Sequence, residues 1–194
     1  MDREHCSADE TDPRSGNALD ITFRSVTRAN FSAVVGLTVT PEQADFVAPN
    51  VYSLAEVAIE PTWTPLAIYA GDDLVGFALF GRDDETGRWW LMRYMIDAQY
   101  QGRGHGTAAL PVLIDLMIER HGCSEIFLDH SPSNDVAERL YARMGFVPTG
   151  EVERGEILAR LGLGDSRSSG GETQPGLVHQ ALPGARRRDA SDVT

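Results

Sequence analysis

The stretch Gln101-Gly102-Arg103-Gly104-His105-Gly106 stands between two segments of regular structure. The segment before it, 88–96, is aromatic and bulky and predicts a strand, whereas the segment after it, 107–120, repeats apolar residues at helical spacing. The glycines therefore lie where a strand turns into a helix. The first backbone N–H groups of a helix lack carbonyl partners and carry the positive end of the helix dipole, and glycines let an anion approach them closely. The stretch predicts a phosphate-binding site.

Composition narrows the class of protein. The chain has 194 residues, enough for one domain with its own core, and its two cysteines are too few for a disulfide framework, which indicates a reducing compartment. An N-terminal apolar leader and an apolar run of membrane-spanning length are both missing, so we expect a cytoplasmic protein with no membrane partner. The formal net charge of −12 argues against a nucleic-acid partner and is compatible with a cationic small-molecule substrate.

The ends of the chain differ in composition from its middle. Residues 1–19 and 164–194 are polar, so we expect two disordered tails around one folded domain, residues 20–163. Asn30, Thr40, Ser53 and Asn134 are expected to start helices as N-caps. The expected strands are 21–26, 66–70, 74–80, 89–96, 125–129, 146–152 and 156–161, and the expected helices include 30–39, 53–59, 107–120 and 134–144. This order predicts an α/β (α+β) domain with a mixed, mostly antiparallel central sheet of six to seven strands flanked by about four helices.

The kind of phosphate follows from what the glycine stretch lacks. A Walker A loop places Lys and then Ser or Thr after its last glycine, and this chain contains no Lys. A dinucleotide-binding loop needs Gly-x-Gly-x-x-Gly, which is absent, and it follows the first strand of a βαβ unit rather than three antiparallel strands. The pattern that remains is Gln-x-x-Gly-x-Gly, with Gln101, Gly104 and Gly106 at the defining positions.

This pattern resembles the motif that binds the pyrophosphate of CoA in the GNAT superfamily of acyl-CoA-dependent N-acyltransferases. A second stretch, Asn134 to Phe146, is similar to the family's signature Asn-x-x-Ala-x-x-Leu-Tyr-x-x-x-Gly-Phe and follows the first in the family's order. The similarity covers residues 21–161, and residues 48–55, 90–97 and 155–158 resemble the spermine/spermidine acetyltransferase branch. The resemblance implies the GNAT fold and an acetyl-CoA-dependent N-acetyltransferase.

The resemblance also implies how acetyl-CoA would bind as co-substrate, with no metal. Its pyrophosphate is expected against the loop, and its pantetheine arm along the strand at 94–96, as an extended partner adds to a sheet edge. For this, the strand must diverge from the strand at 125–129, and a backbone donor near Met95 is the expected oxyanion stabiliser. The expected cofactor-binding residues are Tyr94, Met95, Ile96, Gln101, Gly102, Arg103, Gly104, His105, Gly106, Thr107 and Asn134.

The catalytic residues are expected beside this strand. Tyr141 holds the tyrosine position of the second signature and is the expected general acid, because a departing thiolate needs only a weak proton donor. The competing interpretation is an aromatic residue packed on the inner face of its helix. Asp129, at the end of its strand, is the favoured base for the amine, with His130 and Glu156 as alternatives.

The acceptor is expected to contact the region 40–56. Its candidate side chains could surround an alkylammonium group, although solvated helix faces explain them equally well; they are Glu42, Asp45, Asn50, Tyr52 and Glu56. The sequence thus predicts acetyl transfer to a primary amine of a small cationic acceptor, a polyamine such as spermidine or spermine, by direct attack in a ternary complex. The alternatives are acetylation of an aminoglycoside-like antibiotic or a protein N-terminus, and an acyl-CoA-binding sensor without turnover. A homodimer is compatible with the sequence.

Overall fold

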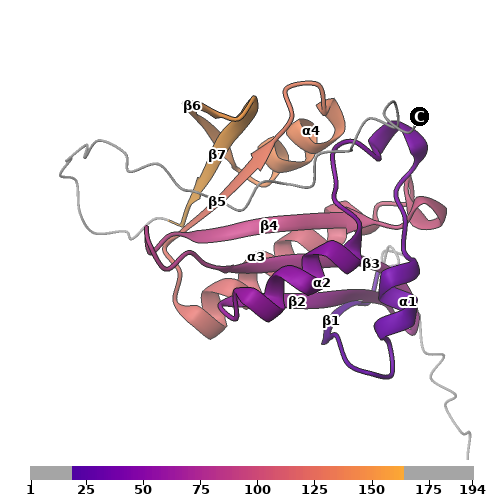
Figure 1. The fold of residues 1–194 in the computed structure, drawn as a ribbon. Coiled ribbons are helices and arrows are strands. Elements are labelled where there is room, and N and C mark those ends of the chain that lie inside the picture. Colours follow the sequence, from indigo (N-terminus) through magenta and orange to yellow (C-terminus); the bar gives the residue numbers. More distant parts are fainter. Residues whose placement is uncertain (1–18, 164–194) are drawn as a thin grey trace, which may run out of the picture.

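A single mixed sheet of seven strands organises the fold (Figure 1). The computed structural model describes residues 19–163, so the two predicted disordered tails lie outside the described residues, residue 19 excepted. The strands lie side by side in the order β1-β2-β3-β4-β5-β7-β6, and every neighbouring pair is antiparallel except β4 and β5. They are β1 (Ile21–Ser25), β2 (Trp63–Ala70), β3 (Asp73–Arg82), β4 (Trp89–Ile96), β5 (Glu125–His130), β6 (Val147–Glu153) and β7 (Glu156–Gly162). The predicted sheet is confirmed.

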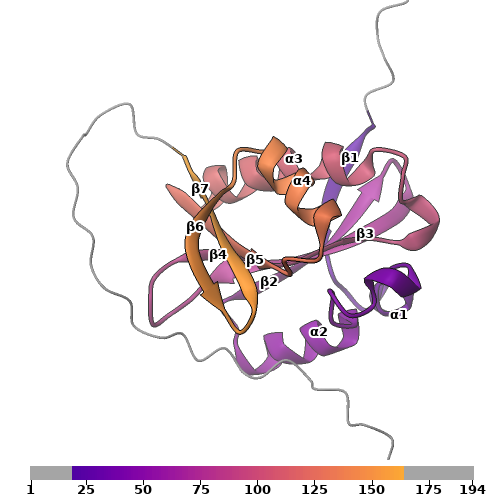
Figure 2. The same cartoon turned by 90° about the horizontal axis from the view of Figure 1, so that it is seen from above.

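Helices cover both faces of the sheet, as the view from above shows (Figure 2). The first pair, α1 (Phe31–Gly36) and α2 (Asn50–Ile59), lies on one face, and the second pair, α3 (His105–His121) and α4 (Asp135–Arg143), lies on the other. Two short 3₁₀ helices, η1 (Pro41–Gln43) and η2 (Ala98–Tyr100), precede α2 and α3. Within residues 19–163, every helix is too short or too polar to cross a membrane.

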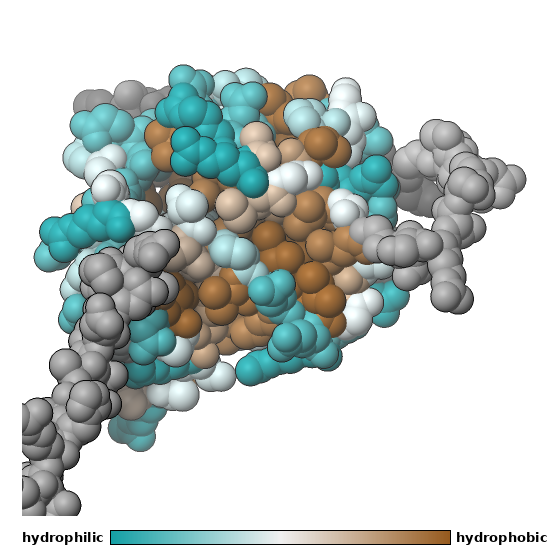
Figure 3. Space-filling model, turned by 180° about the vertical axis from the view of Figure 1, so that it is seen from behind, coloured by the Kyte–Doolittle hydropathy of each residue, from teal (hydrophilic) through white to brown (hydrophobic). Residues whose placement is uncertain are grey.

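The core has two layers, one on each face of the central strands. In β3, Phe77 and Leu79 pack on the α1–α2 side, whereas Ala78 and Phe80 pack on the α3 side. Because β3 is covered on both faces, its buried run is nearly continuous instead of alternating. On the side of the molecule where α3 lies, apolar side chains also form a patch at the surface (Figure 3).

The observed starts of the helices can be compared with the four N-caps predicted from the sequence. The prediction for Ser53 is wrong: α2 begins at Asn50, and Ser53 lies inside it, fully buried. The helix expected from Thr40 is limited to the single turn η1. Asn30 precedes α1 but its side chain accepts the N–H of Thr27 instead of a helix N–H. The prediction for Asn134 is confirmed, because its Oδ1 accepts the backbone N–H of Ala137 at 3.1 Å.

Candidate active site

The parallel strands β4 and β5 pair at one position and then separate. Trp90 and Phe127 are the paired residues, and beyond them β5 leaves β4 at an angle (Figure 1). The opposite edge of β4 stays paired with β3, where a register shift between Leu91 and Arg93 leaves Met92 as a bulge. The divergence expected from the sequence is therefore present, and it leaves the β5-facing edge of β4 available to an extended partner.

The glycine loop joins β4 to α3 through η2. Gly102 and Gly104 have φ angles of +73° and +84°, which favour glycine, and a Cβ built on either meets nothing within 4 Å. The helix begins at His105, two residues before the predicted start, so Gly106 and Thr107 belong to its first turn. The loop therefore presents an open helix N-terminus, as an anion site requires.

Two of the residues expected to bind the cofactor, Gln101 and Tyr94, use their side chains for hydrogen bonds within the protein. The Gln101 amide nitrogen donates to Gln43 Oε1 at 2.7 Å and to the carbonyl of Ile96 at 2.9 Å. The Tyr94 hydroxyl donates to the carbonyl of Gly106 at 2.7 Å, which fixes the first turn of α3 against β4. Burial raises the pKa of the Tyr94 phenol, and the neighbouring Tyr141 raises it further. Both side chains support the loop, which leaves backbone groups to face an anion.

Arg103 and His105, two further residues expected to bind the cofactor, differ in the exposure of their side chains. The Arg103 guanidinium lies 5.8 Å from the centre of the Tyr100 ring and its side chain is exposed, so its charge is free to face solvent or an anion. The His105 ring is buried edge-on against Tyr100, in keeping with a residue that contributes its backbone alone. The loop from Gln101 to Thr107 lies outside the lining of the large cavity described next.

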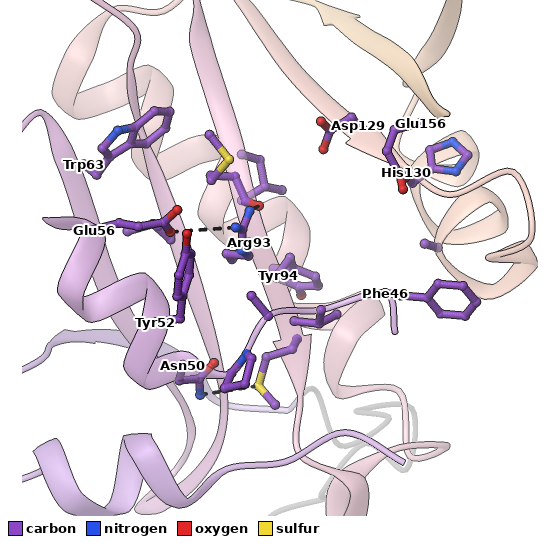
Figure 4. A pocket seen from close by; sticks show the side chains of 18 of the residues that line it. Phe46, Asn50, Tyr52, Glu56, Trp63, Arg93, Tyr94, Asp129, His130 and Glu156 are labelled. Carbon is purple, nitrogen blue, oxygen red and sulfur yellow. Dashed lines mark hydrogen bonds and ion pairs between the residues drawn. The ribbon is translucent and has the colours of Figure 1, made fainter. Parts of the chain in front are cut away.

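A cavity of about 1140 Å³ opens at the divergence of β4 and β5 (Figure 4). Its walls come from the segment between α1 and α2, from α2 itself, from β4 and the turn before it, from the end of β5, from α4, and from the start of β7 and the turn before it. Carboxylates outnumber guanidinium groups in this lining. They are Asp45, Glu56, Glu60, Asp83, Asp84, Glu85, Asp129 and Glu156, against Arg93 and Arg154. The excess of negative charge favours a cationic ligand.

Tyr141 lines the cavity from the inner face of α4. Its side chain is 9% exposed and its ring contacts those of Phe146 and His130, with centroids 5.8 and 6.1 Å away. Burial raises the pKa of its phenol, and the negative charge of Asp129 adds to the shift. The hydroxyl is therefore protonated at neutral pH. Packing and proton donation are compatible in this position.

The three candidate bases lie together on β5 and β7, across the cavity from α2 (Figure 4). Burial raises the pKa of the Glu156 carboxyl, and the nearby Asp129 carboxylate raises it as well, whereas His130 opposes the shift. The His130 ring is buried, and its Nδ1 lies 3.1 Å from the carbonyl oxygen of Ser131. Because a base works best with a pKa near the working pH, the raised pKa is compatible with Glu156 as the base.

The acceptor candidates divide into those inside and outside the cavity. Asp45, Tyr52 and Glu56 line it; Glu42 does not, because its side chain is exposed on η1, where its own backbone N–H and Thr40 lower its pKa. Asn50 also borders the cavity, but it is 3% exposed and its amide donates to the carbonyl of Val34 at 2.9 Å. Asn50 therefore links α2 to α1.

Sequence reasoning missed Arg93, which lies in the middle of the cavity wall. Its Nη2 approaches Glu56 Oε2 to 3.7 Å, and its Nη1 donates to the carbonyl of Met92 at the bulge at 2.7 Å (Figure 4). Both side chains are about four-fifths buried, with 19% and 18% exposed. The available signal was a single arginine within an otherwise apolar strand, Trp89 to Ile96. A charged side chain in such a buried strand requires a partner of opposite charge or a hydrogen-bond acceptor.

Comparison with known proteins identifies the family. Residues 33–146 match the model of the acetyltransferase (GNAT) family. A spermine/spermidine N(1)-acetyltransferase of Bacillus subtilis is 34% identical over 141 residues, which cover 70% of this chain and 93% of that protein. The chain belongs to the GNAT family, and it is an N-acetyltransferase that acts on amines.

Two solved structures share the fold at low sequence identity. A spermidine N-acetyltransferase from Vibrio cholerae, in complex with CoA and spermine, superposes with a TM-score of 0.58 at 17% identity, covering 73% of this chain and 93% of that chain. An aminoglycoside acetyltransferase in complex with coenzyme A superposes with a TM-score of 0.61 at 19% identity, covering 73% and 94%. These two similarities concern the fold alone, because proteins of one fold differ in substrate.

Proposed function

We propose that this N-acetyltransferase transfers the acetyl group of acetyl-CoA to a primary amine of a polyamine, spermidine or spermine. The observation that carries the proposal is the carboxylate-rich cavity that joins Tyr141 to the wall of Tyr52 and Glu56. A linear polycation fits such a lining better than a neutral or anionic acceptor. The 34% identity to a spermine/spermidine acetyltransferase over most of the domain supports the same substrate class.

The residues of the loop and of β4 fit acetyl-CoA. Gly102 and Gly104 leave open space where a Cβ would stand, which gives a diphosphate room to reach the N–H groups at the start of α3. The open edge of β4 from Tyr94 to Ile96 offers backbone groups to an amide-rich arm. When bound, acetyl-CoA supplies the acetyl group and a thiolate leaving group.

The other chemical steps belong to residues of the cavity. Glu156 takes a proton from the ammonium group, directly or through water, so that the neutral amine attacks the thioester carbonyl. A backbone N–H near Met95 stabilises the oxyanion, and Tyr141 donates its proton to the departing sulfur. The proton that the amine nitrogen loses as the amide forms returns to Tyr141 and restores its hydroxyl. Among residues 19–163 the only cysteine, Cys123, is buried in the core away from the cavity, which favours direct attack over an acetyl-cysteine intermediate.

Replacing Glu156 by Gln tests the base. We expect kcat/KM for the amine to fall about 100-fold, since a positioned base contributes at least that much. In the wild type the rate should rise with pH through the pKa of Glu156, which lies above the ordinary glutamate value because of burial and Asp129. The variant should lose this acidic limb. Steady-state rates at a series of pH values provide the measurement.

The matched control for this change is Glu151→Gln, on the exposed strand β6. It removes the same charge from the neighbouring strand without touching the cavity, so its pH profile should equal that of the wild type. If Glu156→Gln kept the wild-type acidic limb while Asp129→Asn lost it, the base would be Asp129, as the sequence first suggested.

The direct test of the proposed function is release of CoA thiol from acetyl-CoA with a panel of amines. The panel contains spermidine, spermine, kanamycin and a short peptide with a free N-terminus. Turnover is expected with the two polyamines at lower amine KM than with the others. Preference for kanamycin or for the peptide would replace the polyamine proposal, and acetyl-CoA binding without turnover of any amine would favour the sensor alternative.

A further inference from the structure

The segment between α1 and α2 is tied to the glycine loop region by three hydrogen bonds. The backbone N–H of Thr38 donates to Asp97 Oδ2 at 2.9 Å, and the N–H of Ala98 donates to the carbonyl of Thr38 at 2.8 Å. The third bond joins two side chains, Gln101 Nε2 and Gln43 Oε1, at 2.7 Å. This third bond connects the first residue of the glycine loop with the middle of the segment, residues 37–49.

The two glutamines stand at the borders of two different sites. Gln101 begins the loop that receives the pyrophosphate under the proposed function, and its side-chain amide also donates a hydrogen bond to the carbonyl of Ile96 at the end of β4. Gln43 ends η1, and residues 44–49, which follow it directly, all line the cavity. The backbone carbonyl of Gln43 also accepts the N–H of Phe46 at 2.9 Å. Gln43 therefore holds the start of a cavity wall that lacks a regular helix or strand of its own.

We propose that Gln43 is a positioning residue that sets the cavity wall at 44–49 through Gln101, so that the wall takes its amine-binding position when the glycine loop is occupied. The inference rests on the proposed function, because it assigns that wall to the acceptor. The physical reason is linkage: a ligand that orders the loop also orders Gln101, and the bond to Gln43 passes that order to the wall. Acetyl-CoA and the amine then bind more tightly together than either binds alone.

Gln43→Met keeps the size of the side chain and removes the acceptor oxygen. We expect the amine KM to rise about two- to tenfold, which is the loss of one net hydrogen bond, whereas kcat and the acetyl-CoA Kd stay within twofold of the wild type. Gln43→Glu keeps an oxygen that accepts the bond, so it should restore the wild-type KM. The control is Gln99→Met, the same change at an exposed position of η2, and it should alter none of these values.

A double-mutant cycle separates this role from general support of the fold. Gln101→Met should raise the amine KM by a similar factor and also weaken acetyl-CoA binding. In the Gln101→Met background, Gln43→Met should add no further rise in KM, because the bond between the two side chains is already absent. A wild-type KM in Gln43→Met, or additive effects of the two changes, overturns the proposal.

Hydrogen exchange gives a readout that needs no turnover. The backbone N–H groups of Ala44 and Phe46 donate hydrogen bonds to carbonyls of η1, so their exchange rates report the order of the wall. Acetyl-CoA should slow their exchange in the wild type and in Gln43→Glu, but not in Gln43→Met. If the amine panel shows no turnover, the proposed function fails, and this measurement still decides the coupling. Equal slowing of exchange in all three proteins overturns the inference.

Discussion

Tyr141→Phe is expected to lower kcat about 100-fold and to leave the Kd of acetyl-CoA within about twofold of the wild type. The change removes the hydroxyl and retains the ring, which packs against Phe146 and His130. Core packing and folding should therefore survive. The loss falls on kcat because the proton is needed when the carbon–sulfur bond breaks, and not when the ligands bind.

The environment of Tyr141 explains why a phenol can serve as the acid. Burial and the charge of Asp129 raise its pKa above the ordinary value of 10.0, so the group keeps its proton at neutral and mildly alkaline pH. The same burial disfavours a free thiolate beside it, which promotes transfer of the proton to sulfur. We therefore expect no loss of activity near pH 10 that titration of an unperturbed phenol would cause.

Tyr69→Phe serves as the matched control, because Tyr69 lies in β2, outside the cavity, with its ring under Arg24. It should leave both kcat and acetyl-CoA affinity unchanged. Rapid-mixing assays separate the chemical step from product release, and thermal unfolding reports the fold. A Tyr141→Phe variant with wild-type kcat would restrict Tyr141 to packing, the competing interpretation of the sequence.

The parts of the fold that were predictable are those set by local patterns. The glycine loop, the strand before it and the helix after it follow from side-chain periodicity and from the backbone freedom of glycine. Asn134 caps α4 because its side chain reaches an N–H three residues away. All of these features depend on residues that are close together in the sequence. The order of the elements then sufficed to predict a mixed sheet flanked by about four helices.

The start of α2 shows how tertiary packing overrides a local signal. The pattern from Ser53 to Glu56 is a capping box, yet Ser53 faces the sheet and is fully buried inside the helix. Its hydroxyl is left without a hydrogen-bond partner. The helix starts earlier because Asn50 bonds to Val34, which holds the first turn against α1. That contact joins separate elements, and periodicity does not report it.

The contacts of the site that the sequence did not predict depend on the same kind of distant partner. Gln101 was expected among the cofactor-binding residues, and the partner of its side chain, Gln43, lies 58 positions away in the sequence. The raised pKa of Glu156 comes first from burial and then from Asp129, which approaches it because β5 pairs with β7. The role of Arg93 depends on Glu56 and on a bulge in β4. A bulge depends on how two strands pair, so the sequence of one strand alone does not predict it.

Gly104→Val is expected to raise the Kd of acetyl-CoA at least tenfold, with a smaller effect on the amine KM. Gly104 is the N-cap of α3 and has a φ of +84°, and a Cβ there would stand in open space beside the first helical N–H groups. Under the proposed function the diphosphate occupies that space. A branched side chain would keep the anion away from the N–H groups, and its electrostatic attraction falls steeply with distance.

The backbone strain of this change needs a control of its own, because a β-branched residue at positive φ costs about 1–2 kcal/mol wherever it occurs. Gly150 supplies one: its φ is +89°, a Cβ there also meets nothing within 4 Å, and it lies on β6, outside the loop and the cavity. Gly104→Val and Gly150→Val should lower the Tm by similar amounts, whereas calorimetric titration should show weaker acetyl-CoA binding in the first alone. Equal affinity in both variants would remove the loop as the pyrophosphate site, since strain alone predicts that the two positions respond alike.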